Sequence, residues 1–150
     1  MSFQEKLSKV INETARDKAF EMLKRSQCKI SGVSVGAAVV ASNPNPDYVD
    51  FHPLVFAGCN IEIATSRVIH AELVALCKAI SEGFTKIESV HVTSTHKEQQ
   101  AALCGYCRQD LMYINPEAMI YVYNPDKTLK IEVKLLDTMN YPYLGKGRVG

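Results

Sequence analysis

The sequence predicts an α/β protein, and three features of its pattern predict it. An amphipathic segment comes first, runs rich in β-branched residues then alternate with helical segments, and no repeat or low-complexity tract interrupts them. Such alternation is typical of a sheet with parallel pairs and crossover helices. We therefore expect a three-layer α/β/α fold with a mixed sheet of about five strands, formed by a single domain over residues 1–150.

The first expected element is a helix over residues 3–25. Ser2 and Glu5 have the spacing of a capping box, which marks a helix start. Apolar residues then recur at helical intervals, and their stripe indicates a helix that packs on the rest of the chain. These residues are Phe3, Leu7, Val10, Ile11, Ala15, Ala19, Met22 and Leu23.

Two strands are expected next, over residues 32–41 and 54–60, and a turn-rich segment at 42–50 would let them pair antiparallel. Gly36 and Ala37 suggest that another backbone or a ligand approaches the first strand closely. Residues 61–69 are expected to be irregular. The remaining elements are expected at 70–83 (helix), 87–94 (strand), 104–115 (helix), 118–123 (strand) and 128–133 (strand), with a polar loop at 95–102.

The composition excludes several classes of function. The formal net charge is +1 and no basic run exceeds two residues, which argues against a nucleic-acid polymer or an acidic membrane as partner. No stretch approaches the roughly 18 apolar residues of a membrane span, and the first ten residues lack the apolar core of a signal peptide. We expect a cytoplasmic protein that acts on a small molecule.

The five cysteines are an odd number in a chain without a secretion signal, which argues against a disulfide framework. Cys28, Cys59 and Cys77 stand among apolar neighbours and are expected to be small buried hydrophobes. Cys104 and Cys107 form a C-x-x-C pair, which needs a chemical explanation. The isolated histidines His52, His91 and His96 are expected to be ordinary core or surface residues.

Two short motifs carry the chemistry: H-A-E, which begins at His70, and C-G-Y-C, which runs from Cys104 to Cys107. Both fall at predicted helix starts, where free N–H groups stabilise thiolates. One imidazole and two thiolates suit a zinc ion, and three protein ligands leave a position for water. Glu72 would stand beside that water as a proton carrier. A redox pair is the alternative for the C-x-x-C motif, but it would not require His70.

H-A-E followed, 34 residues after its histidine, by C-G-Y-C-R-Q resembles the zinc signature of the cytidine deaminase superfamily. The resemblance covers nearly the whole chain in order and spacing. It implies a cytidine deaminase-like fold and the zinc-dependent hydrolysis of cytidine or deoxycytidine to uridine or deoxyuridine and ammonia, a reaction of pyrimidine salvage. Its further segments are S-V-G-A-A at 34–38, N-I-E at 60–62, L-L at 135–136, and the aromatic residues Tyr141 and Tyr143.

The resemblance implies a role for each matching residue. His70, Cys104 and Cys107 would bind Zn²⁺, and Glu72 would shuttle protons. The expected substrate contacts are Asn60 and Glu62 on the ribose hydroxyls, the Leu103 carbonyl on the amino group, and Ala71, Val33 and Tyr141. The family also implies a homo-oligomer, a tetramer with a dimer as the alternative, in which Tyr141 or Tyr143 of a neighbouring copy closes the site.

The chain departs from the family pattern at several positions. Leu103 stands where proline is usual before the first cysteine, and Val33 where an aromatic residue often packs on the pyrimidine. The segment between Asn60 and His70 is about one residue shorter than usual. Leu73 follows Glu72 where arginine is frequent in family members with three cysteines; a neutral histidine and two thiolates leave a zinc site of zero formal charge, which needs no arginine.

Three other interpretations remain open. Blasticidin-type deaminases share the zinc motifs, so the same chemistry could act on another aminated heterocycle such as blasticidin S. A structural zinc module would need a fourth protein ligand, from Cys77 or His96. A polynucleotide editor would need a basic, aromatic surface, which the near-neutral charge does not favour.

Overall fold

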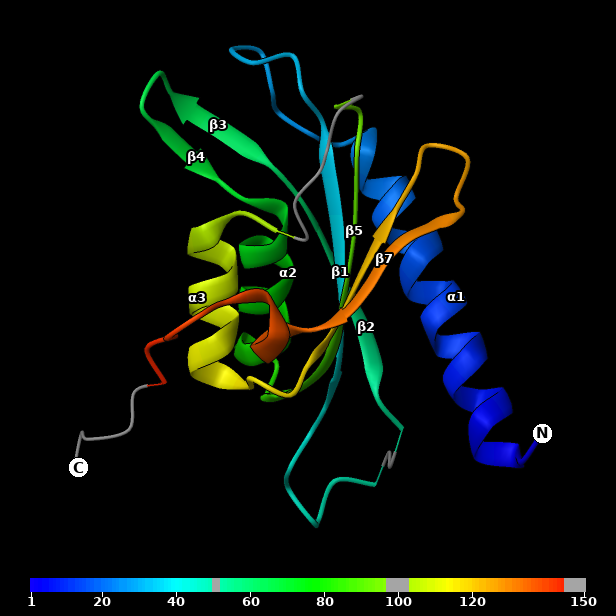
Figure 1. Cartoon of the computed structure of the whole chain (residues 1–150). Coiled ribbons are helices and arrows are strands. Elements are labelled where there is room, and N and C mark those ends of the chain that lie inside the picture. Colours follow the sequence, from blue (N-terminus) through cyan, green and yellow to red (C-terminus); the bar gives the residue numbers. More distant parts are fainter. Residues whose placement is uncertain (50–51, 97–102, 145–150) are drawn as a thin grey trace.

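The structure is a computed structural model that describes residues 1–49, 52–96 and 103–144 (Figure 1). The expected α/β fold is confirmed, with a mixed sheet of five strands. The elements in chain order are α1 (Phe3–Leu23), β1 (Val35–Ser42), β2 (Leu54–Cys59), β3 (Ile61–Ala64), β4 (Arg67–Ile69), α2 (Ala71–Ser81), β5 (Lys86–Ser94), α3 (Gly105–Ile114), β6 (Met119–Tyr123), β7 (Leu129–Lys134) and the 3₁₀ turn η1 (Leu135–Thr138).

The strand order of the main sheet is β2-β1-β5-β6-β7. β1 is antiparallel to both β2 and β5, β5 and β6 are parallel, and β7 returns antiparallel to β6. The expected crossover between β2 and β5 does not make them neighbours, because β1 lies between them. β1 takes this place because its small and β-branched residues are buried on both of its faces.

Helix α1 covers one face of the sheet and helices α2 and α3 cover the other, which gives the three expected layers (Figure 1). The capping box is formed as predicted, with Ser2 and Glu5 bonded to each other's backbone N–H. The close approach expected at Gly36 is also found: a Cβ there would lie 1.9 Å from the Ala19 carbonyl oxygen. Small residues therefore let α1 lie directly on β1.

Residues 61–69 are not irregular, as the sequence had indicated, but form the β3–β4 hairpin, in which Ile61 pairs with Ile69. The prediction failed because the hairpin is short and its tip is exposed, so that it shows no hydrophobic period. The expectation that Cys77 is buried was also wrong. It lies on the solvent side of α2, and Cys28 and Cys59 are half-buried.

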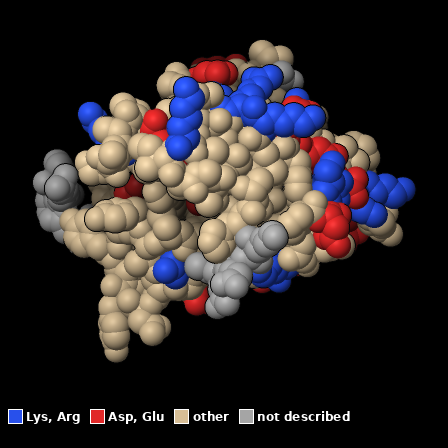
Figure 2. Space-filling model, turned by 90° about the horizontal axis from the view of Figure 1, so that it is seen from above, with Lys and Arg blue, Asp and Glu red and all other residues tan. Residues whose placement is uncertain are grey.

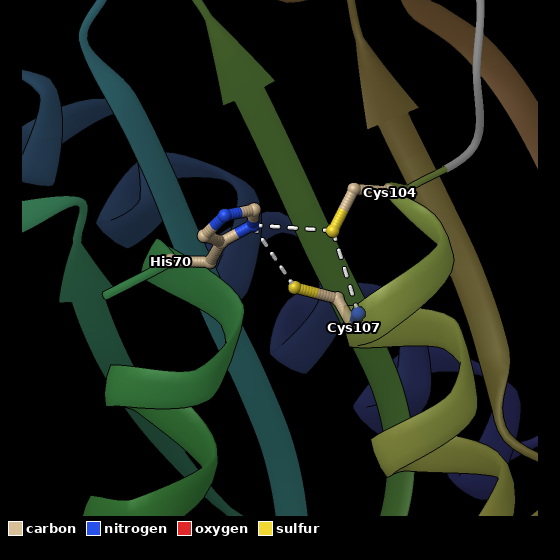
Figure 3. Close-up of side chains that lie close together, drawn as sticks. All are labelled: His70, Cys104 and Cys107. Carbon is tan, nitrogen blue, oxygen red and sulfur yellow. Dashed lines mark hydrogen bonds between the residues drawn. The ribbon is translucent and has the colours of Figure 1, made fainter. Parts of the chain in front are cut away.

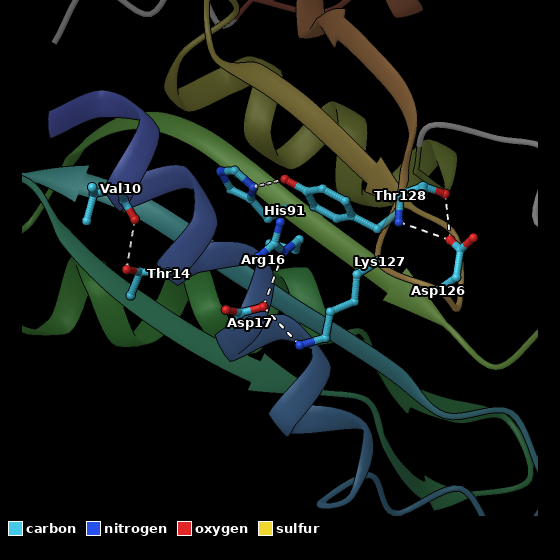
Figure 4. A network of polar contacts seen from close by, with 9 residues as sticks. Val10, Thr14, Arg16, Asp17, His91, Asp126, Lys127 and Thr128 are labelled. Atoms are coloured by element: carbon cyan, nitrogen blue, oxygen red, sulfur yellow. Dashed lines mark hydrogen bonds and ion pairs between the residues drawn. The ribbon is translucent and has the colours of Figure 1, made fainter. Parts of the chain in front are cut away.

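A polar layer lies between α1 and the sheet. His91 is fully buried on β5, and its Nδ1 lies 2.8 Å from the Tyr123 hydroxyl (Figure 4). Its Nε2 lies 3.0 Å from the Ser89 hydroxyl. At the edge of this layer, Lys127 bonds Asp17 of α1 at 3.0 Å and joins the β6–β7 turn to that helix. No helix in the described residues is long and apolar enough to cross a membrane.

Burial lowers the pKa of His91 to about 3. In the unfolded chain a histidine titrates near 6.5, so between these values only the unfolded state binds the proton. This histidine therefore makes its full contribution to stability above about pH 6.5, and the contribution is lost as the pH falls toward 3.

We predict that His91→Gln flattens the dependence of the free energy of unfolding on pH between 6.5 and 4.5. The difference in slope from the wild type should approach about 1.4 kcal/mol per pH unit, the value for one proton. Urea unfolding at a series of pH values measures both slopes. Parallel curves for the two proteins would contradict a buried, neutral His91.

Candidate metal centre

The structure brings His70, Cys104 and Cys107 together although the first cysteine lies 34 positions after the histidine (Figure 3). The Nδ1 atom of His70 lies 3.1 Å from Cys104 Sγ and 3.4 Å from Cys107 Sγ. All three ligand atoms lie within 4.8 Å of one another. The sequence prediction that these side chains form one cluster is therefore met by the geometry.

Local structure explains why they meet. His70 is the N-cap of α2 and Cys104 is the N-cap of α3, and both have extended backbone angles. The two helices lie side by side on one face of the sheet and begin at the same end of it (Figure 1). The N–H of Cys107 points at Cys104 Sγ across 3.4 Å, so the first turn of α3 supplies a donor to the sulfur.

The donor set fits a metal ion. With Zn–S near 2.3 Å and Zn–N near 2.0 Å, a tetrahedral zinc site places its nitrogen and sulfur ligands about 3.5 Å apart, close to the separations found here. Imidazole and thiolate are ligands that zinc favours. No fourth His, Cys, Asp or Glu joins this group among the described residues. Cys77 faces solvent from α2, so it gives no support to a closed structural site.

Two acidic groups at the cluster are shielded from water. Burial raises the pKa of the Cys107 thiol, and the nearby Glu72 carboxyl raises it further. Burial also raises the pKa of Glu72, whose side chain is only 6% exposed. A bound cation would oppose both effects, because it stabilises the deprotonated forms. A buried carboxyl group beside such a centre is placed to carry protons.

A cavity of about 290 Å³ opens beside the cluster. Of the residues that the sequence indicated, Asn60, His70, Ala71, Glu72, Leu103 and Cys104 line this cavity. Val35, Val68 and Ser94 also line it and were not foreseen. Ser94 could have been noticed as the last residue of a strand at the edge where the helices begin. Val35 and Val68 carried no such signal.

The other expected substrate contacts lie elsewhere. Val33, Glu62 and Tyr141 are not among the residues that line the cavity. Tyr141 is fully exposed, and its φ of 55° is in the left-handed region. Glu62 accepts hydrogen bonds from the N–H groups of Ile30 and Ser31, and the bond from the Ser31 hydroxyl is the main cause that lowers its pKa.

The buried Asn60 side chain is held by three hydrogen bonds. Its Oδ1 accepts from the Val35 N–H at 2.8 Å and from the Ser26 hydroxyl at 2.5 Å, and its Nδ2 donates to the Val33 carbonyl at 2.9 Å. These bonds fix which end of the amide is oxygen and which is nitrogen. Because Nδ2 carries two hydrogens, one donor is left for a partner in the cavity.

Comparison with known proteins accounts for the motifs. Residues 9–123 match the family described as the cytidine and deoxycytidylate deaminase zinc-binding region. The chain belongs to this family. A probable cytidine deaminase of Dictyostelium discoideum is 30% identical over 107 residues, which are 71% of this chain and 63% of that protein. A cytidine deaminase of Mycoplasma genitalium is 26% identical over 111 residues, 73% of this chain and 78% of that protein.

Solved structures show the same fold. The crystal structure of cytidine deaminase from Burkholderia pseudomallei superimposes with a TM-score of 0.73 at 22% identity, over 87% of this chain and 98% of that chain. The cytidine deaminase of Mycobacterium tuberculosis gives a TM-score of 0.66 at 20% identity, over 87% of this chain and 95% of that chain. The family and the fold implied by the sequence resemblance are thus confirmed.

We predict one tightly bound metal ion per chain in the purified, reduced protein. Cys107→Ala should lower the metal content at least about tenfold and reduce the melting temperature, because metal binding and folding are coupled. Elemental analysis measures the content. Cys77→Ala is the matched control, since it removes an exposed thiol and should keep the metal. An unmodified protein without metal would contradict the assignment.

Proposed function

We propose that this chain is a zinc-dependent hydrolytic deaminase that converts cytidine or deoxycytidine to uridine or deoxyuridine and ammonia, a reaction of pyrimidine salvage. The observation that carries the proposal is the convergence of one imidazole and two cysteine sulfur atoms on one edge of a cavity whose wall includes a buried carboxyl group, Glu72. Membership of the deaminase family and the names of its relatives support it.

In the proposed mechanism, His70, Cys104 and Cys107 hold the zinc ion and Glu72 moves the protons. Zinc held by these side chains would supply a bound water molecule of lowered pKa. Glu72 takes a proton from water and delivers it to the ring nitrogen, while the hydroxide that remains bonds to the carbon that carries the amino group. Glu72 then passes the proton of this new hydroxyl group to the amino group, so that the carbon–nitrogen bond breaks, ammonia leaves and the oxygen stays as a carbonyl.

Backbone groups at the two helix starts would orient the base. Ala71 and Leu103 both line the cavity, one at the first turn of α2 and the other just before the N-cap of α3. We propose that the carbonyl of Leu103 accepts a hydrogen bond from the amino group of the base, and that the N–H of Ala71 donates to another acceptor on the base. Leucine in place of proline keeps the carbonyl at this position, although it no longer fixes the φ angle.

The charge distribution on the surface near the site agrees with a small substrate. Seen from the end where α2 and α3 begin, residues other than Lys, Arg, Asp and Glu make up most of this face, and acidic side chains lie beside the basic ones (Figure 2). The formal net charge of +1 agrees with this view. Neither observation favours the extended basic groove that a polynucleotide backbone requires.

We predict that Glu72→Gln keeps the fold and the bound metal but lowers kcat at least about 100-fold, because general acid–base groups contribute roughly 10²–10⁴-fold. Steady-state deamination assays together with metal analysis separate the two effects. Glu82→Gln, at the other end of α2, is the matched control and should retain full activity. A Glu72→Gln enzyme with more than about a tenth of normal kcat would contradict the proposed role.

The substrate is predicted from the polar wall of the cavity. Asn60 has one donor left for a sugar hydroxyl, and this donor stays unpaired when the free base binds. We expect kcat/KM for cytidine or deoxycytidine to exceed that for cytosine at least about tenfold. Turnover of blasticidin S without turnover of either nucleoside would show that the same zinc chemistry acts on the alternative substrate.

We propose further that the protein assembles as a homotetramer. The C-terminal segment supports this, because it holds a large aromatic side chain fully in solvent. Arg108 donates to the Thr138 carbonyl at 2.5 Å, and Gln109 exchanges two hydrogen bonds with the backbone of Tyr143. These hydrogen bonds fix the backbone on both sides of Tyr141 in the sequence. The Tyr141 side chain points away from its own chain, where it could contact a neighbouring copy.

Light scattering at assay concentration tests this assembly. We expect about four times the 16.7 kDa of one chain, and Tyr141→Ala should raise KM if the neighbour's site is closed by this ring. Full activity of a monomeric protein would refute the proposed assembly and leave the chemistry of the site untouched.

A further inference from the structure

The last residue of strand β5 places a polar side chain at the wall of the cavity. Ser94 is only 7% exposed and lines the cavity, whereas Val92, two residues earlier, belongs to the apolar core. Side chains two positions apart on a strand point to the same face of the sheet. The Ser94 hydroxyl therefore lies where the apolar interior ends and the cavity begins.

The backbone at Ser94 is fixed by its pairing with the start of β1. Ser94 is the partner of Val35 in the register of these two strands. At the next position, the Thr95 N–H donates to the Ser34 carbonyl at 2.9 Å, and the Ser34 N–H donates to the Thr95 hydroxyl, also at 2.9 Å. These bonds hold the end of β5 against β1, so the Ser94 side chain is in place before a substrate binds.

The Ser94 hydroxyl has hydrogen-bonding capacity that the described residues do not use. Its oxygen accepts from the His96 N–H at 3.0 Å, and it makes no other hydrogen bond with the described part of the chain. A hydroxyl group has one donor hydrogen and two acceptor lone pairs, so the hydrogen and one lone pair remain. Because buried polar groups are normally paired, this remaining capacity suits a polar ligand in the cavity.

The order of the strands indicates which part of a substrate Ser94 would meet. The Asn60 N–H bonds the Val35 carbonyl at 3.2 Å from the β2 side, and Ser94 pairs with Val35 from the β5 side. Asn60 and Ser94 thus stand on either side of Val35, with their backbones about 10 Å apart, or two strand spacings. If Asn60 bonds the sugar, Ser94 lies at the end of the cavity that receives the base.

Leu103 lies toward the same end of the cavity as Ser94. Helix α2 packs on β1 and β2, whereas α3 connects β5 to β6. Leu103 directly precedes the N-cap of α3, and it lines the cavity together with Ser94. The group of the base that bonds the Leu103 carbonyl is therefore also the group that Ser94 can reach.

We propose that Ser94 is a specificity-determining residue whose hydroxyl bonds the amino group of the base beside the Leu103 carbonyl. The proposal rests on the proposed function, because it takes Leu103 to accept from that amino group. The amino group has two hydrogens, of which Leu103 takes one and the Ser94 oxygen takes the other. Attack of hydroxide on the ring gives the amino nitrogen a free lone pair, and the hydroxyl can then turn its hydrogen toward it.

A change in the substrate combined with a change in the residue tests this contact. In N4-methylcytidine, a methyl group replaces one amino hydrogen, and hydrolysis would release methylamine in place of ammonia. With the remaining hydrogen on Leu103, the methyl group meets the Ser94 hydroxyl. We expect Ser94→Ala to lower kcat/KM for cytidine about tenfold, because the hydrogen bond is lost. The inhibition constant of N4-methylcytidine against cytidine should fall at least about threefold, because alanine makes room for the methyl group.

The opposite direction of these two effects separates a substrate contact from a structural role. Loss of the His96 bond in Ser94→Ala would weaken both nucleosides alike if Ser94 only shaped the end of β5. Metal content should not change in this variant, since Ser94 is not among the three clustered ligands. Ser81→Ala, which removes an exposed hydroxyl at the far end of α2, is the matched control and should change neither constant.

Each alternative outcome has a definite meaning. Equal weakening of both nucleosides in Ser94→Ala, or no change in either, would overturn the proposal while leaving the deaminase function intact. Tighter binding of 5-methylcytidine in place of N4-methylcytidine would put the hydroxyl beside the neighbouring ring carbon, and would overturn it as well. If the wild type turned over no nucleoside, the proposed function itself would fail, and the role of Ser94 would fail with it.

Discussion

The juxtaposition of two helix N-termini at one edge of the sheet is the constraint on which the rest of the site depends. A helix start exposes free N–H groups and the positive end of the peptide dipoles, so it tolerates anionic sulfur. His70 and Cys104 occupy the two N-caps, and Cys107 lies one turn into α3. The cavity, the buried Glu72 and the backbone of Ala71 are all placed by the same two helix starts.

Without a bound cation, the charged forms of the acidic groups at these helix starts are unfavourable. Cys107 and Glu72 are both buried, and both have pKa values raised by desolvation, so their charged forms are disfavoured in the protein alone. A divalent ion reverses the balance by attracting the deprotonated thiols.

The layer on the other face of the sheet, between the strands and α1, contributes to the stability of the fold. There, β5 presents Ser89 and His91 to α1, and the imidazole is stacked at 4.7 Å on Tyr121. A neutral histidine satisfies both neighbouring hydroxyls, because one nitrogen donates and the other accepts. The same strand ends at Ser94 on the cavity wall. Strand β5 thus joins a polar, structural layer to the edge at which the chemistry is proposed.

The sequence by itself indicated that His70, Cys104 and Cys107 form one cluster, and it predicted most of the helices and strands that bear these residues. Capping residues, helical periods and the C-x-x-C spacing are local features, and local features follow from a few neighbouring residues. Ser2, His70 and Cys104 therefore begin helices where the pattern indicated. Only the tertiary structure decided the β3–β4 hairpin, the place of β1 between β2 and β5, and the apolar cavity residues Val35 and Val68.

The same distinction explains Asn60 and Glu62. Their residue types and order resemble a sugar-binding pair, and the sequence could indicate no more than that. Their hydrogen bonds go to residues 25 to 34 positions away, and such partners are chosen by the fold as a whole. Non-local pairing has no sequence period, since loop closure and packing decide it together. For this reason the sequence indicated the type of reaction, whereas only the structure showed which hydrogen bonds hold residues 26–35 beside the site.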